Sequence, residues 1–197
     1  MALRIPVYIA SVNNLSDARY CAGMGVKWLG FSSQDLGSIL SENDLKGILQ
    51  WVEGIETVLE IRNYNLNADL LKMDFDSYLS KEAGLFPQDE KSKIFEFNIE
   101  SSKSLKSSVE HLDHYDYLLL KSSEDTENID EAQKKLLLSL AGKFQLILGF
   151  GITMKNLKWI EKELKPAGIM LKGGNEIRPG FKDFDELADI LEYLEID

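Results

Sequence analysis

The fold is decided by one stretch of sequence, Gly168-Ile169-Met170-Leu171-Lys172-Gly173-Gly174-Asn175-Glu176-Ile177-Arg178-Pro179-Gly180-Phe181-Lys182-Asp183. It begins with an apolar run that is too short for a helix, continues through a glycine pair, and passes a Pro-Gly turn before an amphipathic segment. This order predicts a strand, a tight loop and then a helix. Successive glycines let backbone N–H groups approach a ligand, and a helix start adds a partial positive charge. The loop therefore suits a phosphate, although a Gly-Gly pair after a strand is more often only a turn.

The rest of the chain repeats the alternation of strand and helix. Short β-rich runs precede segments that open on capping side chains and often end at glycine. The predicted strands are residues 7–10, 27–31, 56–61, 75–79, 93–97, 115–120, 144–148 and the run that begins at Gly168. The predicted helices are residues 17–22, a segment capped at 41–44 that runs to 51, and residues 67–73, 102–112, 130–140, 153–164 and 184–193.

Eight strand-then-helix units predict a (β/α)8 TIM barrel formed by residues 1–197 as a single domain. The strands are too apolar to have a solvated face, as expected for a parallel sheet covered by helices. Gly84 and Pro87 interrupt the segment after the fourth strand, which predicts a degenerate fourth helix. A doubly wound open sheet is the alternative, but the first strand-to-helix turn lacks its glycine fingerprint.

Composition restricts the classes of partner. The 197 residues carry a net charge of -11, which argues against nucleic acid because a phosphate backbone needs a basic surface. One cysteine and two histidines provide no metal-ligand spacing, so we expect no metal and no cofactor. No signal peptide or membrane-spanning run is visible, which predicts a cytoplasmic protein without membrane contact, as a monomer or homodimer.

Ligands of such barrels bind at the carboxyl ends of the strands, so the residues that end each run are the candidates. The last two strand ends are glycine-rich and follow neighbouring strands, which predicts a shared phosphate site. The predicted phosphate-binding residues are Gly149, Gly151, Lys172, Gly173 and Gly174. The other predicted site-lining residues are Ser11, Ser32, Arg62, Ser80 and Lys121.

Three segments match the motifs of one known family. Asp17-Ala18 through Gly30-Phe31 keep the spacing D-A…A…G…GF, and Leu148-Gly149-Phe150-Gly151-Ile152-Thr153…Asn156 is similar to L-A-G-G-L-…-N. Gly173-Gly174-Asn175-Glu176…Pro179-Gly180…Lys182-Asp183 is similar to S-S-G-V-E…P-G-x-K-D. Over essentially its whole length the chain therefore resembles phosphoribosylanthranilate isomerase of tryptophan biosynthesis. The resemblance implies a single-domain (β/α)8 barrel and an Amadori-type isomerisation.

The chain departs from that family where the chemistry takes place. The family's K-I-C-G, whose cysteine is the general base, corresponds to Tyr8-Ile9-Ala10-Ser11, and its L-L-D, whose aspartate is the general acid, corresponds to Leu119-Leu120-Lys121. The family's S-P-R aligns with Leu36-Gly37-Ser38, and its Q-L-H-G with Tyr78-Leu79-Ser80-Lys81. A methyl group and an ammonium thus stand where the resemblance places the base and the acid.

These departures lead to the functional hypothesis. Each positioned acid or base contributes roughly 10²–10⁴-fold to a rate, and Ala10 can neither accept nor donate a proton. We therefore expect a barrel that binds a phosphorylated small molecule but is inactive or altered as an isomerase. The alternatives are an isomerase that uses other groups, a lyase that forms a Schiff base on Lys121, and a scaffold that only binds proteins.

Two carboxylates inside apolar strands accompany Lys121. Glu60 and Glu96 are costly to bury unless they are paired or hydrated. If they point inward, Lys121 and Lys172 are natural partners, and we favour the inward direction for Glu60. A Lys121 that only pairs with a carboxylate or a phosphate is the simpler alternative to a Schiff-base lysine.

Overall fold

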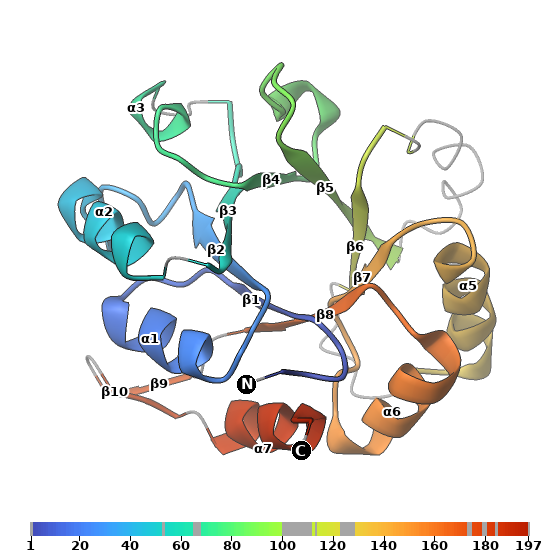
Figure 1. Ribbon diagram of the computed structural model, residues 1–197. Coiled ribbons are helices and arrows are strands. Elements are labelled where there is room, and N and C mark those ends of the chain that lie inside the picture. The colour runs from blue at the N-terminus through green and yellow to red at the C-terminus, as the bar shows by residue number, and fades with distance from the viewer. Residues whose placement is uncertain are drawn as a thin grey trace.

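Eight parallel strands close into a barrel in the computed structural model, which describes residues 2–52, 54–64, 68–99, 112, 114–122, 129–172, 175–178, 181–183 and 185–196. Each strand pairs with the next in chain order, and the last pairs with the first (Figure 1). The strands are β1 (Val7–Ala10), β2 (Trp28–Ser32), β3 (Glu56–Glu60), β4 (Ser77–Ser80), β5 (Ser92–Asn98), β6 (Tyr117–Lys121), β7 (Leu146–Leu148) and β8 (Gly168–Lys172). The predicted barrel class is confirmed.

Helices surround the barrel in the connections between strands (Figure 1). They are α1 (Leu15–Gly23), α2 (Glu42–Trp51), α3 (Ala68–Leu71), the single 3₁₀ turn η1 (Ala83–Leu85), α5 (Glu131–Ala141), α6 (Met154–Trp159), which continues into the π-helix η4 (Ile160–Leu164), and α7 (Asp185–Leu194). Side-chain caps at Asn14, Ser41 and Asp130 set three of the starts, the last as a capping box with Gln133.

The connections after β4 and β8 depart from the simple alternation of strand and helix. The fourth crossover holds only η1 before β5, which agrees with the predicted degenerate helix. After β8 the predicted strand and the predicted last helix are present, but the segment between them was not expected to contain strands. Two antiparallel strands, β9 (Asn175–Arg178) and β10 (Phe181–Asp183), form a hairpin before α7. The helix predicted at 102–112 lies outside the described residues.

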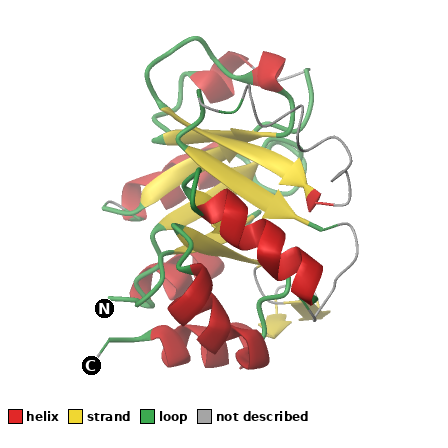
Figure 2. Ribbon diagram, turned by 90° about the vertical axis from the view of Figure 1, so that its right-hand side faces the viewer, coloured by secondary structure: helices red, strands yellow, loops and turns green. Residues whose placement is uncertain are grey.

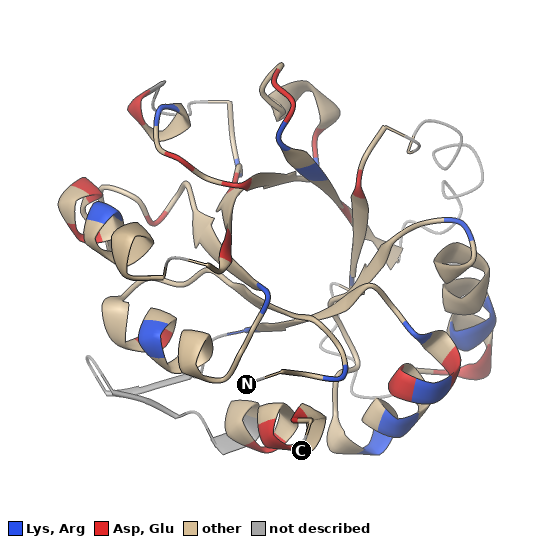
Figure 3. Cartoon of the chain, viewed as in Figure 1, with Lys and Arg blue, Asp and Glu red and all other residues tan. Residues whose placement is uncertain are grey.

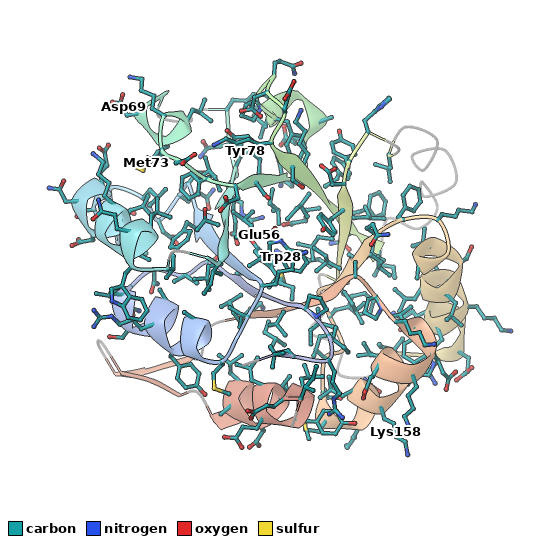
Figure 4. All side chains as sticks on the ribbon, in the orientation of Figure 1. Trp28, Glu56, Asp69, Met73, Tyr78 and Lys158 are labelled. Atoms are coloured by element: carbon teal, nitrogen blue, oxygen red, sulfur yellow. The ribbon has the colours of Figure 1, made fainter. Side chains whose placement is uncertain are left out.

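The core has two shells. Side chains that alternate along the strands fill the barrel interior, and the residues between them pack outward against the helices. The interior cluster consists of Tyr8, Ala10, Trp28, Val58, Leu79, Ile94, Leu119, Ile147 and Met170. At the amino ends of the strands, Trp28 donates its indole N–H to Glu56 at 2.7 Å (Figure 4). Its ring also packs edge-on against Tyr117. The interior is thus filled at that end.

The chain termini meet on the side opposite the carboxyl ends of the strands (Figure 2). Leu3 bridges to Glu195, and the Arg4 N–H donates to the Leu194 carbonyl at 2.8 Å. None of the helices in the described part of the chain has the length and apolar character of a membrane-spanning helix.

Candidate functional site at the carboxyl ends of the strands

Alternating carboxylates and cations cross the mouth of the barrel, at the carboxyl ends of β3, β5 and β6. Arg62 Nη2 lies 2.6 Å from Glu60 Oε2, and Arg62 Nη1 lies 2.7 Å from Glu96 Oε2. Lys121 Nζ lies 3.1 Å from that same oxygen of Glu96. We call Glu60, Arg62, Glu96 and Lys121 the mouth network. Most other charged residues lie on the outer helices and loops (Figure 3), so the network is a local feature of the barrel strands.

Glu60 is the buried end of the mouth network, with no exposed surface. Its Oε1 accepts from the Tyr8 hydroxyl at 2.6 Å and from the Ser11 N–H at 3.0 Å. Its Oε2 accepts from the Ser11 hydroxyl at 3.1 Å, in addition to Arg62. Both oxygens are therefore saturated, which is the condition under which a buried carboxylate is tolerated. The inward direction expected for Glu60 is confirmed.

Gly30 provides the space for this buried pair. A Cβ at Gly30 would lie 2.2 Å from the Tyr8 hydroxyl oxygen and 2.3 Å from Glu60 Oε1. Since the closest real Cβ contacts exceed 3 Å, any side chain at this position would displace the hydrogen bond. Glycine is thus required at position 30 by the interior of the barrel.

Arg62 lies between the two carboxylates and is largely buried. Burial by itself lowers the pKa of the guanidinium, but the Glu60 and Glu96 carboxylates outweigh this effect and raise the pKa above its usual value. Burial and the neighbouring Glu60 carboxylate likewise raise the pKa of the Tyr8 hydroxyl, so it remains a donor. Arg62 therefore stays charged and Tyr8 stays protonated near neutral pH.

Glu96 and Lys121 form the outer end of the mouth network, with side chains 14% and 26% exposed. Burial tends to raise the pKa of Glu96, but Lys121 and Arg62 outweigh it and lower the pKa. A carboxylate with a lowered pKa is a weak base. The expected ion pair of Lys121 with a carboxylate is present, and the partner is Glu96.

Ala10 and Ser11 end β1 beside this network. Ala10 is 7% exposed and belongs to the interior cluster, where it pairs in register with Lys172 of β8. Ser11 has a left-handed backbone with φ of 53°, which is uncommon for a residue with a side chain. Its two hydrogen bonds to Glu60 offset this strain. No group at Ala10 can move a proton.

Gly149 and Gly151 follow β7, which is the strand next to β6, and β6 ends at Lys121. The Gly149 N–H donates to the Leu120 carbonyl at 2.8 Å, and a Cβ at Gly149 would meet that same carbonyl oxygen at 2.8 Å. Gly151 has a φ of 64°, a left-handed backbone that favours glycine. Both glycines are thus required by the backbone itself, independently of a ligand. The described residues contain one buried side-chain polar atom without a hydrogen-bond partner, Thr153 Oγ1, two residues further on.

The remaining predicted site residues differ in position. Ser32 lies on the same strand face as Gly30, and its hydroxyl accepts from the Gln34 N–H at 3.3 Å. Ser80 follows the interior residue Leu79, so it points to the outer side, where its buried hydroxyl accepts from the Glu82 N–H at 3.1 Å. Lys172 is exposed at the end of β8. Gly173 and Gly174 lie outside the described residues.

Tyr8 is the site residue that the sequence analysis missed. Its signal was available, because Tyr8 and Ala10 are two residues apart on one strand and so share a face. Among the described residues, no group of three His, Cys, Asp or Glu side chains is placed to hold a metal ion.

Two of the hollows formed by the described residues lie away from the mouth. One, of about 390 Å³, lies between α2 and the segment after α3, near Asp69 and Met73 at the periphery of the molecule (Figure 4). The other, of about 220 Å³, borders the starts of β6 and β7 near Tyr117 and Gln145. Because barrel ligands bind where strands end, we place the candidate site at the mouth and not in these hollows.

Comparison with known proteins finds similarity both in sequence and in fold. No family model matches the chain. The N-(5'-phosphoribosyl)anthranilate isomerase of Crocosphaera subtropica is 29% identical over 147 residues, which are 73% of this chain and 67% of that protein. The crystal structure of phosphoribosyl anthranilate isomerase from Thermotoga maritima matches with a TM-score of 0.73 at 17% identity and covers 95% of this chain and 97% of that chain. An isomerase of this kind in complex with reduced 1-(o-carboxyphenylamino)-1-deoxyribulose 5-phosphate matches with a TM-score of 0.69 at 17% identity, over the same shares of the two chains.

Proposed function

We propose that the chain is a member of the phosphoribosylanthranilate isomerase family that binds a phosphorylated small molecule of the sugar-phosphate type without catalysing the family's isomerisation. The observation that carries the proposal is the composition of the mouth. Ala10 stands at the position that the resemblance assigns to the base, and Lys121, at the position of the acid, is ion-paired with Glu96 at 3.1 Å.

The neighbouring carboxylates do not replace the missing groups. Glu60 accepts four hydrogen bonds and has no exposed surface, so it is closed to substrate. Glu96 is the only other carboxylate of the mouth network, and its cationic neighbours lower its pKa. Loss of a positioned acid and a positioned base removes roughly 10²–10⁴-fold each, which accounts for an inactive barrel.

Three features support phosphate binding after β7 and β8. Gly151, just before α6, has a left-handed backbone. The Thr153 hydroxyl has no hydrogen-bond partner among the described residues, and Lys172 is exposed at the end of the neighbouring strand β8. A bound oxyanion would accept the missing hydrogen bond from the Thr153 hydroxyl and would be attracted by the Lys172 ammonium. The relative in complex carries a 5-phosphate ligand, which supports the same chemistry here.

The experiment has a catalytic and a binding part. Purified protein should show no turnover of phosphoribosylanthranilate. Ribose 5-phosphate should raise the melting temperature, because at a concentration of one hundred times Kd it adds about 2.7 kcal/mol to the free energy of unfolding. Ribose without phosphate is the matched ligand control. The Lys172→Met variant should bind ribose 5-phosphate roughly tenfold more weakly because it loses a charged hydrogen bond.

Lys158→Met is the matched protein control, since Lys158 lies on the outside of α6 (Figure 4). It removes the same charge and should leave binding unchanged. Turnover at ordinary enzyme rates would refute the loss of activity. Absence of stabilisation by any phosphorylated ligand would refute the binding site.

A further inference from the structure

The mouth network has free hydrogen-bonding capacity at its outer end. Glu96 Oε2 is occupied by Arg62 and Lys121, whereas Glu96 Oε1 accepts no hydrogen bond from the described residues. Lys121 Nζ carries three donors and contacts one carboxylate. Glu60, by contrast, is saturated on both oxygens. An acceptor and donors with open positions thus lie side by side, and both side chains are partly exposed.

This outer end borders the glycine segment. Lys121 ends β6, and Gly149 follows β7, whose residue Leu148 pairs in register with Leu120. From Gly149 to Glu96 the distance is two strand spacings, about 10 Å in total. A small phosphorylated molecule whose phosphate lies at the β7 end would therefore place its other end against Glu96 and Lys121.

We propose that Glu96 Oε1 and Lys121 Nζ bind two neighbouring hydroxyl groups of the ligand, so that the site takes a phosphorylated polyol. The inference rests on the proposed function. One hydroxyl donates to the carboxylate oxygen while its neighbour accepts from the ammonium, and a vicinal diol offers both at adjacent atoms. Arg62 is a positioning residue, because its two contacts hold Glu96 relative to the buried Glu60.

The same arrangement disfavours a ligand carboxylate at this end. The mouth network contains two carboxylates and two cations, so it offers no net positive charge. An anionic group beside Lys121 would also face the open oxygen of Glu96, and like charges at close range repel. The outer end of the mouth therefore favours neutral hydroxyl groups of a ligand over a ligand carboxylate.

The test compares two sugars that differ by one hydroxyl. Affinities of ribose 5-phosphate, 2-deoxyribose 5-phosphate and inorganic phosphate are measured by isothermal titration calorimetry on the wild-type protein, Glu96→Gln and Glu131→Gln. Glu131→Gln is the matched control, because it removes the same charge from an exposed ion pair with Lys134 on α5. On the wild type, ribose 5-phosphate should bind about tenfold more tightly than its deoxy analogue, since an unfilled polar site is costly.

In Glu96→Gln the ratio of the affinities for ribose 5-phosphate and 2-deoxyribose 5-phosphate should fall toward one, while the affinity for inorganic phosphate stays unchanged. Glu131→Gln should behave as the wild type. Equal binding of the two sugar phosphates by the wild type overturns the inference and leaves phosphate binding intact. Failure of all three compounds to bind overturns the proposed function as well. The comparison on unchanged protein does not depend on whether a variant folds.

Discussion

At the scale of single residues, Glu60 and Glu96 are two glutamates of the mouth network that have different roles because they are buried to different degrees. Glu60 has no exposed surface and holds Tyr8, Ser11 and Arg62 in place. Glu96, at 14% exposed, keeps one oxygen open. A saturated carboxylate stabilises the arrangement of its donors, while an open one can contact a ligand.

The pKa of Glu96 predicts how stability depends on pH. Its neighbours Lys121 and Arg62 lower the pKa below the ordinary 4.5, despite the opposing effect of burial. The stabilisation from the ionised carboxylate is therefore complete above about pH 4.5 and is lost as the pH falls through the folded-state pKa. Urea unfolding of the wild type and of Glu96→Gln should show a difference in free energy that decreases between pH 6 and pH 3. A difference that stays constant over this range would contradict the assignment.

At the scale of elements, the mouth depends on how closely β1, β2 and β3 approach one another. Tyr8 of β1 reaches Glu60 of β3 across β2, and it can do so only because β2 carries no side chain at Gly30. Strand pairing alone does not require this glycine. The requirement comes from two large side chains that meet in the interior.

Gly30→Ala should therefore destabilise the protein by roughly 1–3 kcal/mol, because the added methyl displaces the Tyr8–Glu60 hydrogen bond. The measurement is the free energy of unfolding in urea. Gly47→Ala is the matched control, since Gly47 lies within α2 and a Cβ there would have no neighbour within 4 Å. It should stabilise by roughly 0.5–1 kcal/mol through helix propensity. A neutral Gly30→Ala would contradict the packing of the interior.

At the scale of the whole molecule, the barrel is closed in two ways. β1 pairs with β8 over four residues, from Val7↔Ile169 to Ala10↔Lys172. The end of α7 then packs under the amino-terminal segment, where Leu194 has no exposed surface and its carbonyl accepts from the Arg4 N–H. Residues from both ends of the chain thus contribute to one core.

Leu194→Ala should cost roughly 2–5 kcal/mol, because it leaves a cavity where the two ends meet. Chemical unfolding measures the change. The control is Ile196→Ala, two residues further on, where the side chain is 52% exposed and the cost should stay within roughly 0.5 kcal/mol. Equal effects of the two substitutions would show that the last turn of α7 does not support the barrel.

Much of the architecture could be predicted because it depends on local patterns. Short apolar runs, capping side chains and the break at Gly84 and Pro87 indicated the strands, the helix starts and the reduced fourth crossover. The hairpin β9–β10 could not be predicted, since Asn175–Arg178 has no strong strand pattern and forms a strand by pairing with Phe181–Asp183. The inward direction of Glu60 could be favoured, but its partners could not be identified.

The sequence by itself determined the kind of barrel and the identity of the residues that end its strands, such as Ala10 and Lys121, because periodicity and residue identity are properties of the chain. Only the tertiary structure decided that Tyr8, Glu60, Arg62, Glu96 and Lys121 form one connected group. These residues come from four strands and the segment after β3, and their contacts arise from the stagger of strands in a closed barrel. Hydrogen bonds and ion pairs depend on distances of a few ångströms, and those distances exist only after the strands have closed on one another.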